Sequence, residues 1–247
     1  MVDPLPRPIV ARGKKRGHPT PKRCFEDFWA AVCQRNARLP EAEAIQRGYR
    51  GMLAVLERTF YPNFVFKGRH RSTSSLERGA LVDSQVSYYI TRGAFPAGCD
   101  LDPYAQRVID FLRESDYEPR AAQVRLYDED THIYTFADIV GVHKPTGKLF
   151  LAELKTGFDA GYRASCPPHS TMSHPLGDIS GGTSLSNQHH LQLGMMADIA
   201  VRKYGVNPKW GGRAFVLLVN ASGVTIRPLK AWYQQNKGDI LDTLAKN

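Results

Sequence analysis

The stretch 133-IYTFADIVGVHKPTGKLFLAELKTG-157 determines the fold that we expect for this 247-residue chain. Residues 133–142 and 148–155 are rich in β-branched, aromatic and other apolar side chains, which is typical of strands. Between them, the sequence KPTG at 144–147 has the composition of a tight turn. These residues therefore predict a β-hairpin.

Three ionisable side chains interrupt the apolar pattern of this hairpin, namely Asp138, Glu153 and Lys155. A carboxylate surrounded by apolar strand residues is costly to bury without a partner. Glu153 and Lys155 are two positions apart, so they project from the same face of their strand. If the turn pairs the strands antiparallel, Asp138 lies near them, and two carboxylates converge with one ammonium group.

Such a convergence suits the hydrolysis of phosphodiester bonds, which needs a hard cation to neutralise phosphate charge and to activate water. Magnesium binds through one or two carboxylates, so we expect Asp138 and Glu153 as ligands, with the main-chain carbonyl of Leu154 as a further one. The Lys155 ammonium group would assist the attacking water. The alternative is a structural cluster of salt bridges at a sheet edge, and the residues alone leave it open.

The periodicity of apolar residues predicts the elements around this hairpin. Helices are expected from residue 25 onward and at 40–60, 76–91, 102–114, 186–204 and 230–244. Further strands are expected at 121–127, 213–220 and 224–229, and a long loop at 158–185. From residue 102 the order is helix, three strands, helix, strand, strand, which predicts an α/β fold with a mixed central sheet flanked by helices.

The positive charge of the chain is concentrated at its N-terminus. The net charge is +9, and residues 1–23 hold seven Lys or Arg against one acidic residue, together with five prolines. We expect a disordered tail at 1–23 and a single domain at 24–247, with a helical part at 24–100 and the core at 101–247. The tail could contact phosphates, act as a localisation signal or serve as a solvated leader, and these readings stay open.

Cysteine spacing and hydropathy restrict the environment of the chain. The four cysteines form no C-x-x-C pair, so we expect reduced thiols and no iron–sulfur cluster. No apolar run approaches the roughly 18 residues of a membrane-spanning helix. The polar N-terminus lacks the pattern of a secretory signal. The expectation is an intracellular protein, cytoplasmic or nuclear and not secreted, that has no membrane partner.

Four motifs give the chain a resemblance to a known family. They are FADIV at 136–140, AELKTG at 152–157, QHHLQL at 188–193 and a glycine, Gly79, followed four positions later by Asp83. In this order they resemble the motifs of the PD-(D/E)XK nuclease superfamily, and within it those of the RecB-like and lambda-exonuclease-like branch. The resemblance covers about residues 76–200.

The resemblance implies a nuclease dependent on Mg²⁺ or Mn²⁺ with a restriction-endonuclease-like αβββαβ core, here following an N-terminal helical extension. By its motifs, Asp138, Glu153 and the Leu154 carbonyl hold the metal, Asp83 assists them, and Lys155 is catalytic. Gln192 matches the glutamine that contacts the substrate phosphate or orients the lysine. Gln188 and His189, one turn earlier, would contact nucleic acid.

A basic strip precedes these motifs. Lys67, Arg69, Arg71 and Ser72 form a strip that could contact phosphates, although a basic surface loop explains them equally well. Together the patterns predict a metal-dependent deoxyribonuclease of recombination, repair or DNA processing, with exonuclease action favoured over endonuclease action. The alternatives are a nucleic-acid-binding module with an inactive nuclease-like core, and an RNA-processing nuclease of the same chemistry.

Overall fold

The computed structural model describes residues 21–62, 73–157, 160–163, 169–206 and 213–246. Its helices are α1 (Pro21–Arg38), α2 (Glu41–Gln46), α3 (Met52–Phe60), α4 (Thr73–Arg92), α5 (Pro103–Glu114), α6 (Leu185–Tyr204) and α7 (Ala231–Ala245), with a short 3₁₀ helix at Ala160–Arg163. Its strands are β1 (Arg50–Gly51), β2 (Tyr117–Asp128), β3 (Ile133–His143), β4 (Lys148–Thr156), β5 (Ala214–Asn220) and β6 (Gly223–Pro228).

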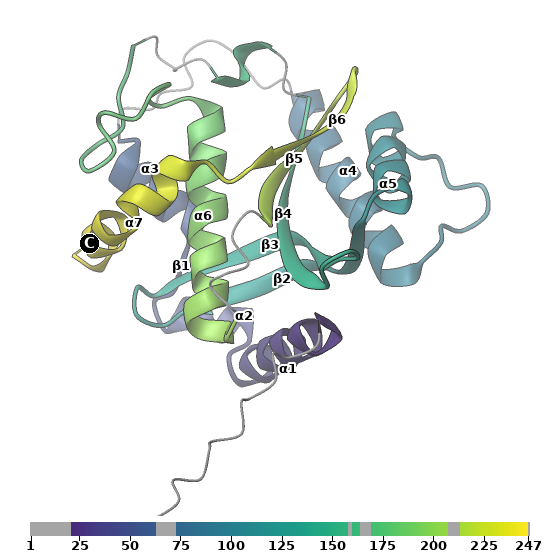
Figure 1. Cartoon of the computed structure of the whole chain (residues 1–247), viewed down its shortest axis with the longest axis horizontal. Coiled ribbons are helices and arrows are strands. Elements are labelled where there is room, and N and C mark those ends of the chain that lie inside the picture. Colours follow the sequence, from purple (N-terminus) through teal and green to yellow (C-terminus); the bar gives the residue numbers. More distant parts are fainter. Residues whose placement is uncertain (1–20, 63–72, 158–159, 164–168, 207–212, 247) are drawn as a thin grey trace, which may run out of the picture.

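The strands form one mixed sheet of six, in the order β1-β3-β4-β5-β6 with β2 also paired to β3. The β1–β3 and β4–β5 pairs are parallel, and the β2–β3, β3–β4 and β5–β6 pairs are antiparallel. The predicted hairpin is thus β3–β4, and the chain is an α/β protein whose mixed sheet is flanked by helices (Figure 1).

Helices cover both faces of the sheet. Helix α6 crosses one face, with α7 beside it, and α4 and α5 lie on the other side (Figure 1). The two apolar cores follow this division. One joins Leu149 and Leu151 of β4 to α6 and α7, and the other joins Phe150 and Ala152 of the same strand to α4 and α5. Strand β4 is therefore buried on both faces, which explains its almost uninterrupted apolar sequence.

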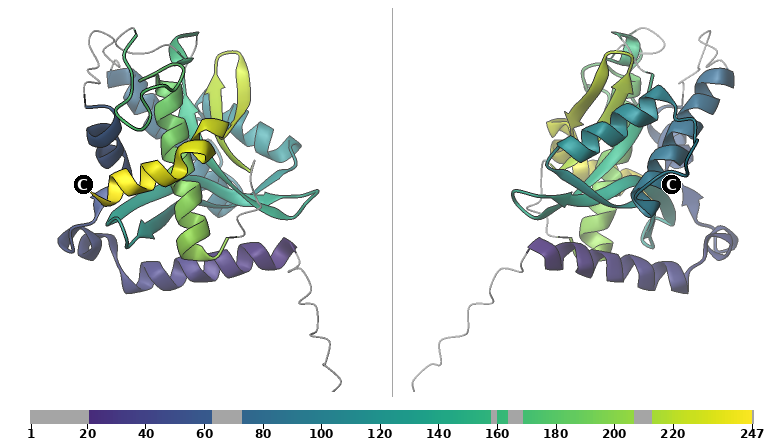
Figure 2. Two further views of the ribbon diagram at one scale, coloured as in Figure 1. Left: turned by 60° about the vertical axis from the view of Figure 1, so that its left-hand side comes forward. Right: turned by 90° about the vertical axis from the view of Figure 1, so that its right-hand side faces the viewer.

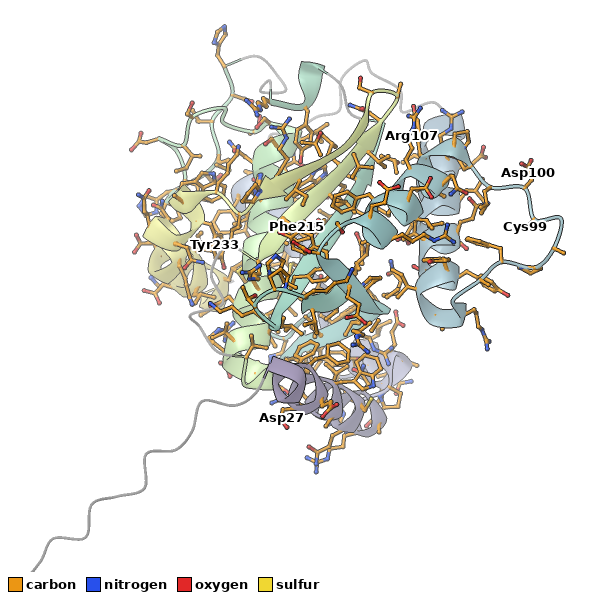
Figure 3. The ribbon with its side chains drawn as sticks, turned by 45° about the vertical axis from the view of Figure 1, so that its right-hand side comes forward. Asp27, Cys99, Asp100, Arg107, Phe215 and Tyr233 are labelled. Atoms are coloured by element: carbon orange, nitrogen blue, oxygen red, sulfur yellow. The ribbon has the colours of Figure 1, made fainter. Side chains whose placement is uncertain are left out.

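Single side chains illustrate the two cores. Phe215 of β5 lies at the sheet, stacked on Phe150 with ring centroids 5.5 Å apart, and Tyr233 lies on α7 (Figure 3). Tyr233 is fully buried against α6, where Gly194 leaves room for its ring. Helix α1 runs along the base of the domain (Figure 2), and its Phe28 joins the α6 core.

The structure differs from two expectations about the N-terminal part, namely the helix at 40–60 and the extent of the tail. The single helix expected at 40–60 is wrong, because the chain forms α2, the two-residue strand β1 and then α3. Gly48 adopts φ +82°, a left-handed conformation that ends α2, and β1 pairs with Ile133 and Tyr134 of β3. Helix α1 begins at Pro21, inside the tail expected at 1–23, while residues 1–20 lie outside the described residues.

Within the described ranges, none of the helices has both the length and the apolar character that a bilayer-spanning segment needs.

Candidate active site

A cleft of about 610 Å³ lies where α3, α4 and α6 meet the end of β4. Asp83, Asp138, Leu154, Lys155 and Gln192, all singled out by the sequence, line it. Glu153 is 1% exposed and lies beneath this lining, bonded to Lys155. The residues of the predicted phosphate-contacting strip, Lys67, Arg69, Arg71 and Ser72, lie outside the described residues.

The β3–β4 register brings the two predicted acids together. Ile139 pairs with Ala152, so the next residues outward along the hairpin are Asp138 and Glu153. The Leu154 N–H donates to Oδ2 of Asp138 at 2.7 Å. Lys155 Nζ donates to Oε1 of Glu153 at 2.5 Å. The structure thus places Asp138, Glu153 and Lys155 in one cluster.

This cluster holds more buried negative charge than its own cation neutralises. Burial, and then the charge of Asp138, raise the pKa of Glu153 to about 7, although Lys155 opposes the shift. Burial raises the pKa of Asp138 as well, against the opposing effects of Lys155 and the Leu154 N–H. Oε2 of Glu153 is buried and has no hydrogen-bond partner among the described residues.

Lys155 stays protonated in this setting. Burial alone would lower its pKa, but the carboxylates of Glu153 and Asp138 outweigh burial and raise it. The charged ammonium group of Lys155 therefore lies in the wall of the cleft, half-buried, with the carboxylates on one side and the cleft on the other.

Asp83 of α4 reaches the cluster through a residue that the sequence did not single out. Gln123 of β2 donates its side-chain amide to both carboxylate oxygens of Asp83, each at 2.9 Å, and to Oδ1 of Asp138 at 3.3 Å. Burial and the charge of Asp138 raise the pKa of Asp83 to about 6. Gln123 could have been identified only from its position opposite Asp138, and that position is known only once the β2–β3 register is known.

Helix α6 supplies a third wall of the cleft. Gln188, His189 and Gln192 all line it. Gln188 donates to the Thr183 carbonyl at 3.2 Å, and Nδ1 of His189 lies 3.1 Å from the Tyr162 hydroxyl.

The neighbouring His190 is fully buried on α6. Burial, with the positive charges of Lys230 and Arg227, lowers the pKa of His190 to about 3, so it is neutral. The adjacent histidines therefore have different surroundings, and of the two only His189 belongs to the cleft lining.

No group of three His, Cys, Asp or Glu side chains suited to one metal ion occurs within the described part of the chain. The protein oxygens that remain as candidates are the carboxylates of Asp138 and Glu153 and the Leu154 carbonyl. The unpartnered Oε2 of Glu153 and the surplus of negative charge both fit a bound cation.

The fold and site define an α/β protein with a buried acid–lysine cluster at the side of a cleft. In comparisons with protein-family models and with curated proteins, nothing matches the chain.

Proposed function

We propose that this chain is a metal-dependent nuclease that hydrolyses phosphodiester bonds of DNA in the cleft beside Lys155. The observation that carries the proposal is the buried Glu153–Lys155 pair next to Asp138, in which Oε2 of Glu153 has no hydrogen-bond partner among the residues that the structure describes. An unpaired buried acceptor destabilises a fold, so this oxygen favours a bound cation over a purely structural salt bridge.

The order of elements supports the same proposal. Helix α5, strands β2, β3 and β4, helix α6 and strand β5 follow one another as in the αβββαβ core of the PD-(D/E)XK superfamily. In this proposal the acids stand on β3 and β4, the second and third strands of that series, and the glutamine motif stands on the helix after them. These positions are those that the motif resemblance implies.

In the proposed site, Asp138, Glu153 and the Leu154 carbonyl would hold Mg²⁺ or Mn²⁺. When bound, the ion supplies positive charge that activates water and neutralises the phosphate. Lys155, held in its charged form, donates hydrogen bonds that orient the attacking water and stabilise charge developing on the phosphate oxygens. Gln192 and Gln188 offer side-chain amides from α6 for contact with the strand being cut.

The decisive experiment compares Lys155→Ala with Lys148→Ala, an exposed lysine on the same strand that serves as the matched control. Purified proteins are incubated with linear and circular DNA and with RNA of the same sequence, in Mg²⁺ or Mn²⁺. We expect Lys155→Ala to lose cleavage by roughly 100-fold or more, as the loss of a single charge-stabilising donor does in other enzymes.

The control variant should keep the parent rate, and the action should favour linear DNA, as an exonuclease requires. Equal cleavage by Lys155→Ala and the parent would refute the proposed mechanism. Binding without cleavage of any substrate by the parent would instead indicate an inactive nuclease-like core, and cleavage of RNA alone would point to the RNA-processing alternative.

A further inference from the structure

Gln123 has an unusual backbone conformation for its place in the fold. It lies within strand β2, yet its φ angle is 51°, in the left-handed region that non-glycine residues rarely adopt. Its neighbours Ala122 and Val124 pair normally with Ile139 and Ala137 of β3, so Gln123 stands directly across from Asp138. A strained residue between two regularly paired neighbours points to a role for its side chain.

The side chain explains what this conformation achieves. It brings one amide nitrogen to Oδ1 of Asp138 at 3.3 Å and to both oxygens of Asp83 at 2.9 Å. The other oxygen of Asp138 accepts the Leu154 N–H. The Asp138 carboxylate is therefore held from both sides, and its orientation toward the cleft is fixed.

We propose that Gln123 is a positioning residue that fixes the Asp138 carboxylate for metal binding, and that Asp83 anchors Gln123 rather than binding the metal itself. This inference rests on the proposed function of the cleft. Groups that hydrogen-bond to a metal ligand orient it, and their loss typically weakens metal binding by roughly 10- to 100-fold.

The place of Asp83 follows from the same contacts. Both of its oxygens accept from the same Gln123 amide nitrogen at equal distance, so the Asp83 carboxylate directly faces that nitrogen. Asp83 then acts on Asp138 through Gln123. Removal of either Asp83 or Gln123 should therefore release the Asp138 carboxylate from its fixed orientation. Residues that act in series give non-additive effects when both are replaced.

The test measures Mn²⁺ binding directly, from the electron paramagnetic resonance signal of free Mn²⁺, and does not depend on cleavage. The variants are Gln123→Gly, Asp83→Ala and the double variant. Glycine removes the amide and also relieves the backbone strain, so Gln123→Gly should fold. His132→Gly is the matched control, because His132 also has a positive φ, 50°, but lies in the β2–β3 turn, where its ring packs against Tyr49 and its carbonyl accepts from the Arg50 N–H.

We expect Gln123→Gly to weaken Mn²⁺ binding roughly 10- to 100-fold and His132→Gly to leave it unchanged. The double variant should bind no more weakly than Gln123→Gly alone. In cleavage assays, excess Mn²⁺ should restore kcat for Gln123→Gly, with the KM for DNA unaltered. If Gln123 had only a structural role, added metal would not restore kcat. Should Gln123→Gly fail to fold, Asp83→Ala tests the same chain of contacts.

Two other outcomes are separable. If the parent binds Mn²⁺ and cuts DNA but Gln123→Gly binds Mn²⁺ equally well, the positioning role is refuted and the proposed function stands. If the losses of the two single variants multiply in the double variant, Asp83 acts independently of Gln123, which overturns its role as an anchor. If the parent neither binds Mn²⁺ nor cuts, the proposed function fails and this inference fails with it.

Discussion

Replacing Glu153 by glutamine should make the protein more stable at pH 8 when divalent ions are absent. Glu153 is 1% exposed, and its pKa is about 7 in the folded chain against an ordinary value of 4.5. Each pKa unit corresponds to about 1.4 kcal/mol. Ionised Glu153 therefore destabilises the folded state by about 3 kcal/mol relative to its neutral form, which glutamine mimics in shape.

The pH dependence has a definite sign. A folded-state pKa above the unfolded value means that the folded chain binds the proton more tightly between about pH 4.5 and 7. The penalty is absent below the unfolded pKa, grows between about pH 4.5 and 7, and is complete above about pH 7. The parent should thus lose stability from pH 5 to pH 8, and Glu153→Gln should remove that component of the loss.

Asp128 provides a matched control with the opposite sign. It is also fully buried, but its carboxylate accepts hydrogen bonds from Thr131 at 2.8 Å and from Arg202 at 2.9 Å. Burial alone would raise the pKa of Asp128, but these partners outweigh burial and lower it. Its charge stabilises the fold above pH 3.8 and stops doing so as the pH falls through the folded pKa.

Asp128→Asn should therefore lower stability at pH 8, by roughly 3 kcal/mol, the lower end for breaking a buried charged pair. The assay is urea denaturation followed by circular dichroism at pH 5 and pH 8 in EDTA. The reasoning is refuted if Glu153→Gln unfolds at lower urea than the parent at pH 8. Glu153 would then be a structural partner of Lys155, the alternative that the sequence left open.

Three further replacements test the packing that positions the cleft, each read from its thermal midpoint. Gly194→Ala should cost about 1–3 kcal/mol despite the better helix propensity of alanine, because its Cβ would lie 2.4 Å from the Tyr233 ring. Tyr204→Phe should cost about 1–3 kcal/mol by leaving the buried Tyr127 N–H, now bonded at 2.8 Å, without its acceptor. Ser184→Ala should cost about 1 kcal/mol by removing the N-cap of α6. An unchanged midpoint would contradict the contact concerned.

Local sequence patterns predicted the hairpin and α6 because their signals are strong over short distances. Strands β3 and β4 are long apolar runs on either side of a turn, and α6 runs for 20 residues without a proline, between the N-cap Ser184 and Gly205. The same patterns missed β1. This strand has only two residues, and its pairing with Ile133 and Tyr134 brings together segments about 80 residues apart in the chain.

The residues of the candidate site likewise differ in whether local sequence could predict them. Glu153 and Lys155 could be placed together from the two-residue period of a strand, and Asp138 from the turn that joins its strand to theirs. Gln123 could not, because a register shift between Pro119 and Ala121 decides which β2 residue faces Asp138. Such a shift and a positive φ depend on the assembled sheet, and neither leaves a mark in the local sequence.

The two buried acids, Asp128 and Glu153, differ in how far their surroundings satisfy a negative charge. Around Asp128, arginine, lysine and threonine side chains supply donors to both oxygens, and the fold gains from its charge. Around Glu153, one lysine faces the carboxylates of Glu153, Asp138 and Asp83, and Oε2 of Glu153 has no donor within the part of the chain that the structure describes. If the cluster existed only for stability, a neutral side chain at 153 would serve it better. A cation from outside the chain would remove the penalty, and it would do so at the place where the cleft, Lys155 and the amides of α6 meet.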